Sequence, residues 1–106
     1  QMMVMYRIPL EAGAQSFSIM LGDNQYELTL VYRDCLYGGW YLDVVRSDGE
    51  VRCLGVPIIV GVDLFAQHSY KGIGHLYASL DGGSLRVPTY EDMGSSLILT
   101  WSPDYE

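Results

Sequence analysis

The chain has little positive charge. Its 106 residues contain six Lys and Arg against 13 Asp and Glu, so the formal net charge is −7, and Lys71 is the one lysine. Nucleic-acid-binding proteins normally carry basic stripes that neutralise phosphates, and docking on an anionic membrane also requires basic side chains. The composition therefore argues against nucleic-acid and membrane partners. It is compatible with a protein partner that carries basic patches.

Cysteine and long hydrophobic runs are also scarce. Cys35 and Cys53 are the two cysteines, and they have no CxxC spacing or paired Cys/His cluster, so no disulfide framework is indicated. We expect two reduced, partly buried thiols, although a bridge between them stays open. The longest apolar runs fall far short of the roughly 20 residues that a membrane-spanning helix needs. No signal-peptide pattern is expected.

Patterns typical of catalysis and cofactor binding are missing. No serine lies in a GxSxG context, and His68 and His75 lack the ligand spacing of a metal site, even with Asp63 or Cys53 as a third ligand. Gly72-Ile73-Gly74 lacks the third glycine and the Lys-Ser/Thr ending of phosphate-binding loops, so it indicates a tight turn. We expect no enzyme activity, no metal and no cofactor.

Hairpin patterns dominate the first half of the chain. Val4–Leu10 reads as an edge strand or a strand that ends at Pro9, and apolar residues alternate with polar ones on both sides of a turn at residues 22–24. A second hairpin spans Gly38–Val60 around Asp48-Gly49, which places Cys53 opposite Val44. Its first strand provides most of the residues that we expect to define the scaffold: Gly38, Gly39, Trp40, Tyr41 and Asp43.

The second half contains the one helix candidate. Asp63 is expected to be the N-cap and a scaffold residue of a short helix over Asp63–Tyr70, which Gly72 would stop. Further strands are expected at His75–Leu80, Leu85–Val87 and Ser96–Trp101. This order predicts an all-β fold: a small OB-fold-like Greek-key barrel over residues 1–106, a single domain, with one short helix between the third and fourth barrel strands. An SH3-like or other small barrel is the alternative.

The aromatic residues allow two functional interpretations. Thirteen aromatics on an OB barrel could stack bases or sugars beside Arg33, Arg46 and Arg52, which would make an oligonucleotide- or oligosaccharide-binding module. The negative net charge opposes the nucleic-acid version, and tyrosine is also enriched at protein interfaces. A protein interaction module is therefore favoured.

Eight short motifs follow one another along nearly the whole chain. They are Tyr6-Arg7-Ile8-Pro9-Leu10, Gln15-Ser16-Phe17-Ser18-Ile19, Tyr32-Arg33-Asp34, Gly39-Trp40-Tyr41-Leu42-Asp43, Gly55-Val56-Pro57-Ile58, Val62-Asp63-Leu64-Phe65-Ala66-Gln67, Gly72-Ile73-Gly74 and Pro88-Thr89-Tyr90. In order and spacing they resemble the phage tail baseplate plug proteins. The resemblance implies an OB-fold domain without catalytic residues or cofactors.

The resemblance also implies a place of action. The protein would be a structural virion component in the plug and hub region of the tail baseplate of a contractile-tail phage or prophage, assembled in the bacterial host cytoplasm. Its partners would be other baseplate, hub and tail-tube proteins, with a homo-oligomer as a further option. Exposed apolar residues for these contacts are expected at the N-terminus and in one loop: Met2, Met3, Met5, Tyr6, Pro88, Thr89 and Tyr90.

Overall fold

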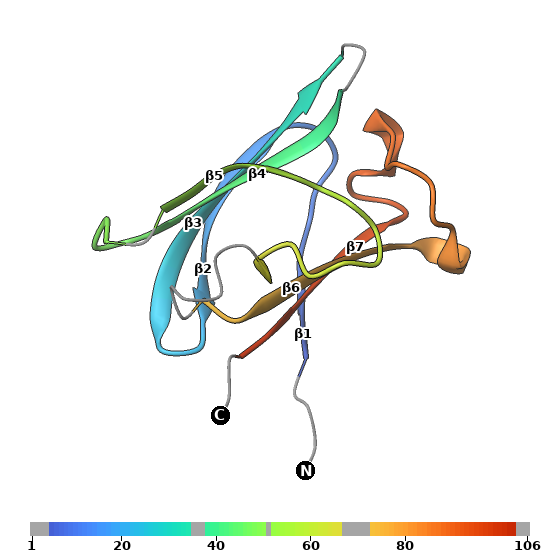
Figure 1. Ribbon diagram of the computed structural model, residues 1–106. Helices are drawn as coiled ribbons and strands as arrows, with labels where there is room; N and C mark the ends of the chain where they lie inside the picture. The colour runs from blue at the N-terminus through green and yellow to red at the C-terminus, as the bar shows by residue number, and fades with distance from the viewer. Residues whose placement is uncertain (1–4, 35–37, 51, 67–72, 104–106) are drawn as a thin grey trace.

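The computed structural model describes residues 5–34, 38–50, 52–66 and 73–103. Within these ranges the chain forms strands β1 (Tyr6–Ile8), β2 (Gln15–Leu21), β3 (Asn24–Arg33), β4 (Gly39–Arg46), β5 (Arg52–Pro57), β6 (His75–Leu80) and β7 (Leu97–Ser102) (Figure 1). Short 3-10 turns, η2 (Asp81–Gly83) and η3 (Tyr90–Asp92), lie between β6 and β7. Within the same ranges, no helix has the length and apolar character that a bilayer crossing requires.

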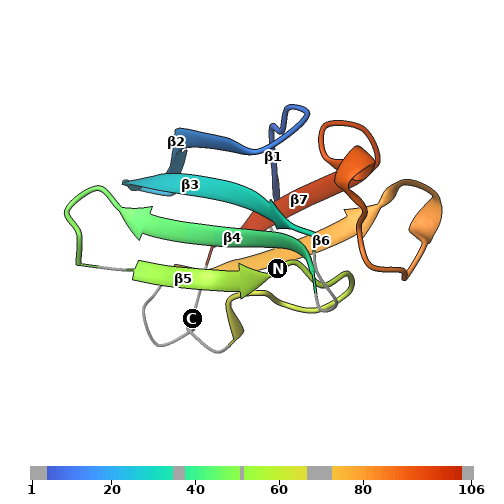
Figure 2. The same ribbon diagram turned by 90° about the horizontal axis from the view of Figure 1, so that it is seen from above.

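The strands form two antiparallel sheets that pack face to face. One has the order β2-β3-β4-β5 and the other the order β1-β7-β6, and Figure 2 shows them as two layers. Alternate residues of each strand point into the space between the sheets, as the period of two requires. The largest fully buried side chains come from both layers and the connecting segments: Trp40, Tyr26, Phe65, Leu28, Leu30, Leu42, Leu76, Met93 and Leu99.

The first predicted hairpin is confirmed. β2 and β3 pair without interruption from Gln15↔Leu30 to Leu21↔Asn24. Gly22 takes the positive φ of 69° that the first position of this two-residue turn requires. On β3 the alternating apolar residues Tyr26, Leu28 and Leu30 are buried.

The second hairpin is confirmed in its register but contains a bulge. Val44 pairs with Cys53 as predicted, whereas Leu42 pairs with Val56, so β5 has one extra residue between the two pairs. Gly55 lies in the bulge with φ 69°. It donates its backbone N–H to Asp43 Oδ1 at 2.7 Å. The Asp43 carboxylate thus satisfies a backbone donor that the bulge takes out of the ladder.

The prediction of a helix at Asp63–Tyr70 is wrong for residues 63–66, and residues 67–70 lie outside the described ranges. The chain pairs with the edge of β6 instead, through bridges Val60↔Ala78 and Asp63↔Tyr77. Asp63 Oδ1 accepts hydrogen bonds from the backbone N–H groups of Phe65 and Leu76, at 3.0 and 3.1 Å. The bond to Phe65 is a local contact within a turn, and the bond to Leu76 ties this turn to β6.

The predicted closed barrel is also corrected. The described residues form two open sheets, since β1 pairs only with β7 and β2 only with β3. β1 has three residues and ends just before Pro9, whose ring nitrogen has no hydrogen to donate to a ladder. The strand expected at Leu85–Val87 is absent, and those residues belong to a loop. The class is therefore mostly β with 3-10 turns, and the described residues form neither a closed OB barrel nor an α-helix.

Candidate functional site

The loop that contains Pro88, Thr89 and Tyr90 is fixed to the scaffold by Trp40. The indole Nε1 of Trp40 donates a hydrogen bond to the carbonyl of Thr89 at 2.9 Å. The ring of Tyr90 stacks on Trp40 with centroids 5.6 Å apart, and Tyr32 contacts both rings edge-on at 5.3 and 5.4 Å. Such aromatic contacts add to the stability that ring burial alone provides. Trp40 and Pro88 are buried, so only the outer part of this cluster reaches the surface.

A buried carboxylate fixes the same loop from within. Asp92 accepts two hydrogen bonds from the guanidinium of Arg86, at 2.6 and 3.0 Å, and two more from the backbone N–H and hydroxyl of Thr89. The bonds from Arg86 contribute most to lowering the pKa of Asp92 far below its ordinary value, although burial opposes them. A charged, fully bonded aspartate therefore holds residues 86–92 in one conformation.

This rigid loop presents apolar side chains to solvent. Leu85 is 83% exposed and Val87 is 67% exposed, and Tyr90 is about half exposed. We call Leu85, Val87 and Tyr90 the loop surface. A small cavity of about 170 Å³ lies between it and the β4–β5 hairpin, lined in part by Trp40, Pro57 and Ile59. Fixed, exposed apolar groups of this kind are typical of protein interfaces.

The described members of the predicted partner interface lie on two different elements. Tyr90 lies against β4 in the four-stranded sheet, whereas Tyr6 lies on β1 and contacts Trp101 with ring centroids 5.8 Å apart. The start of β1 pairs with the end of β7, through Tyr6↔Trp101, whereas the loop that contains Tyr90 precedes β7 (Figure 1). Met5 and Tyr6 are exposed and Pro88 is buried. Met2 and Met3 lie outside the described residues.

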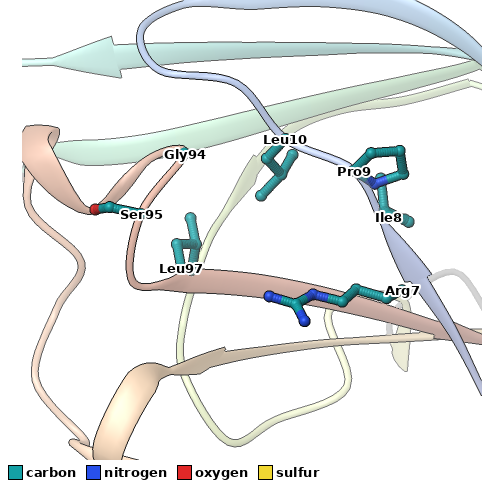
Figure 3. Close-up of a pocket in the computed structure, with 7 residues that line it drawn as sticks. All are labelled: Arg7, Ile8, Pro9, Leu10, Gly94, Ser95 and Leu97. Carbon is teal, nitrogen blue, oxygen red and sulfur yellow. The ribbon is translucent and has the colours of Figure 1, made fainter.

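Two hollows border β1, and neither was foreseen from the sequence. One, of about 350 Å³, lies between β1 and the loop before β7 (Figure 3), where Leu10 and Leu97 point toward one another. The other, of about 600 Å³, separates β1 from β2, and we call it the β1–β2 groove. Its walls include Ile19, Met20 and Trp101. The sequence signal for the β1–β2 groove was the strand at residues 15–21. This strand has no charged residue and no proline that would discourage another strand from pairing with it.

Two residues weighed as metal ligands, Asp63 and His75, contact each other in the described part of the chain. No group of three or more His, Cys, Asp or Glu side chains lies close enough there to hold a metal ion. His75 Nδ1 lies 2.7 Å from Asp63 Oδ2. Burial alone would raise the pKa of Asp63, but hydrogen bonds from His75 and two backbone N–H groups hold it below its ordinary value. That carboxylate is engaged in holding the fold.

The remaining candidates are dispersed or lie outside the described ranges. Arg33 pairs in register with Gly39, and Arg46 with Tyr26, so the two arginines are at opposite ends of the β3–β4 ladder. At about 3.3 Å per residue they are roughly 20 Å apart along the sheet, and Arg52 pairs in register with Val45, the neighbour of Arg46 on β4. Arg46 is also paired with Asp48. His68 and Cys35 are not described, so the predicted states of the thiols stay predictions.

Comparison with known proteins gives one family. The family model described as "Cyanophage baseplate Pam3 plug gp18" matches residues 5–104. No curated protein matches the chain.

Proposed function

The chain belongs to the cyanophage baseplate plug family, and from this premise we propose that it is a structural component of a phage tail baseplate that acts by binding other proteins. The observation that carries the proposal is the extent of the family match, which spans residues 5–104. The partners would be hub and tail-tube proteins of the same phage, and the place of action would be the virion. No catalytic step is part of this function.

The loop surface supports contact with proteins rather than with small ligands. Leu85 and Val87 are among the most exposed apolar side chains of the molecule. They adjoin a loop that Trp40 and Asp92 hold in place. A preformed apolar surface loses little conformational entropy when a partner covers it, so more of the contact energy becomes affinity. We propose Thr89 and Tyr90, with Leu85 and Val87, as contact residues.

The N-terminal residues complete the proposed interface. Met5 and Tyr6 are exposed at the start of β1, and Met2 and Met3 precede them in the chain. Methionine packs adaptably against varied surfaces. Because Tyr6 lies on β1 against Trp101 and Tyr90 lies against Trp40 of the other sheet, we propose that the N-terminal residues contact a different partner, or a different part of the same partner.

Binding to purified baseplate proteins tests the proposal. We expect the chain to bind at least one hub or tail-tube protein of its phage, and the double variant Leu85→Ser/Val87→Ser to weaken that binding by about tenfold or more, which corresponds to 1.4 kcal/mol. Leu54→Ser is the matched control, since Leu54 is also exposed but lies on β5. The proposal fails if no baseplate, hub or tail-tube protein binds the chain.

A further inference from the structure

Three of the four sheet edges carry features that hinder the addition of another strand. β5 contains the Gly55 bulge and ends at Pro57. β1 has only three residues and is followed by Pro9. The outer edge of β6 is bridged by Val60 and Asp63. Bulges, prolines, short strands and covering segments are the devices by which proteins protect sheet edges from pairing with other chains.

At the fourth edge, β2, none of these devices is found among the described residues. It runs for seven residues as Gln15-Ser16-Phe17-Ser18-Ile19-Met20-Leu21, without charge or proline, and its register with β3 is unbroken. In a two-residue hairpin the pair next to the turn, here Leu21 with Asn24, shares both ladder hydrogen bonds. The backbone N–H and C=O groups of Ser16, Ser18 and Met20 therefore point away from β3, toward the open edge.

The inner face of β2 is incompletely covered. Phe17 and Ile19 are only half-buried, whereas their partners on β3, Leu28 and Tyr26, are buried. The β1–β2 groove of about 600 Å³ lies beside the second half of β2. In Figure 1, β1 and β2 diverge from their connecting loop toward the Gly22 turn. An added strand would place alternate apolar side chains in this groove, over Ile19 and against Trp101.

The charges beside β2 favour a basic partner. Glu11 and Asp23 flank the strand, and Glu27 lies behind it on the outer face, with its Oε2 3.3 Å from Ser16 Oγ. Arg7 is the basic side chain at the groove. A lysine or arginine opposite the small Ser18 can reach over it toward Glu27, which pairs with Ser18 on β3. A second copy of this chain would instead bring another formal charge of −7.

We propose that the free edge of β2 accepts an extended strand from another baseplate protein, whose alternate residues are apolar toward the β1–β2 groove and basic toward solvent. This inference rests on the proposed function, because that function supplies the partner. Backbone hydrogen bonds to Ser16, Ser18 and Met20 provide the binding, and the groove and Glu27 select the side chains. The added strand extends the four-stranded sheet on the side that faces β1.

A designed peptide tests the edge without requiring a known partner. The probe is a blocked nine-residue peptide of alternating Val and Lys, and its controls are the Val/Glu peptide and the Val/Lys peptide with a central Pro. We expect the Val/Lys peptide to bind at least about tenfold more tightly than either control and to slow hydrogen exchange at Ser18 and Met20. Equal binding of all three peptides, or no binding, would overturn the proposal.

Two variants locate the effect. Ser18→Pro removes an outward N–H, so we expect it to weaken binding of the Val/Lys peptide about tenfold or more. Since a proline could disturb the strand, Glu27→Gln provides a second test at an exposed side chain and should weaken binding at low salt without unfolding the protein. Glu50→Gln, in the exposed turn after β4, is the matched control and should bind like the unchanged chain.

Purified hub and tail-tube proteins provide the second arm. Protection of the Ser18 and Met20 amides in such a complex supports the proposal, whereas a complex in which these amides exchange as in the unbound protein overturns it. If no such protein binds, the proposed function fails. The peptide experiment alone then decides whether the β2 edge accepts an added strand. A concentration-dependent dimer that protects the same amides would mean that a second copy fills the edge, and would overturn the basic partner strand.

Discussion

Trp40 Nε1 donates its hydrogen to the carbonyl oxygen of Thr89 across 49 positions of sequence, at 2.9 Å. This bond joins strand β4 to the loop that presents Leu85 and Val87, the most exposed large apolar side chains among the described residues. It connects two groups of residues that the sequence motifs suggested separately. The stability of the fold and the shape of the loop surface therefore depend on the same indole.

Replacement of Trp40 should separate these two roles. Trp40→Phe keeps an aromatic ring but leaves the Thr89 carbonyl without its donor, so we expect a loss of about 1–3 kcal/mol in the free energy of unfolding. Trp40→Ala also creates a cavity and should cost about 3–5 kcal/mol. Urea denaturation followed by far-UV circular dichroism measures both. Equal stability of Trp40→Ala and the unchanged chain would contradict the burial of this side chain.

The Asp92 network should make stability depend on acid pH. The pKa of Asp92 in the folded state lies below its ordinary value of 3.8, so its ionised form stabilises the fold above about pH 4. That contribution is lost as the pH falls further toward the folded-state pKa. The lowered pKa of Asp63 acts in the same direction.

We therefore expect the Tm of the unchanged chain to fall between about pH 5 and pH 2, and to fall less steeply in Asp92→Asn. At pH 7 this variant should be less stable by about 1–3 kcal/mol, because it loses hydrogen bonds to a charged group. Differential scanning calorimetry across this pH range measures both effects. Parallel pH curves for the two proteins would show that Asp92 does not contribute.

Gly74 should tolerate no side chain. Its φ of 111° lies in the region that favours glycine, and an added Cβ would collide with the carbonyl of Ser102 and lie 2.9 Å from the indole nitrogen of Trp101. We expect Gly74→Ala to cost more than about 3 kcal/mol, because both strain and overpacking apply. Gly49→Ala is the control: its φ is 78° but nothing lies near the added Cβ, so about 1–2 kcal/mol is expected. Chemical denaturation of both variants checks the difference.

Asp63 should hold residues 60–66 against β6. Asp63→Ala removes the acceptor for the backbone N–H groups of Phe65 and Leu76, which leaves buried donors unpaired. We expect a loss of about 1–3 kcal/mol and faster hydrogen exchange at these two amides. Amides of the β2–β3 hairpin serve as the internal control, because these two strands form their ladder with each other and not with Asp63. Unchanged exchange at Leu76 would contradict the role of Asp63.

The local pattern was sufficient for the hairpins but not for the segment that follows them. Strict alternation and a glycine turn predicted β2 and β3, and the turn at Asp48-Gly49 correctly placed Cys53 opposite Val44. The sequence predicts Asp63 as the N-cap of a helix, whereas the chain at this point pairs with β6. An aspartate accepts hydrogen bonds equally well at a helix start and in a turn, so only the neighbouring strand decides between them.

The sequence by itself determined the β class, the strands with clear alternation, and the baseplate plug family, because side-chain periodicity, turn residues and motif order are local properties of the chain. Tertiary structure alone decided that the sheets stay open beside β1, that Trp40 binds Thr89, and that β2 has an unprotected edge beside a groove. These features depend on which segments meet across long sequence separations. The local propensity of a segment does not specify its long-range contacts, because packing and backbone hydrogen bonding in the folded state determine them.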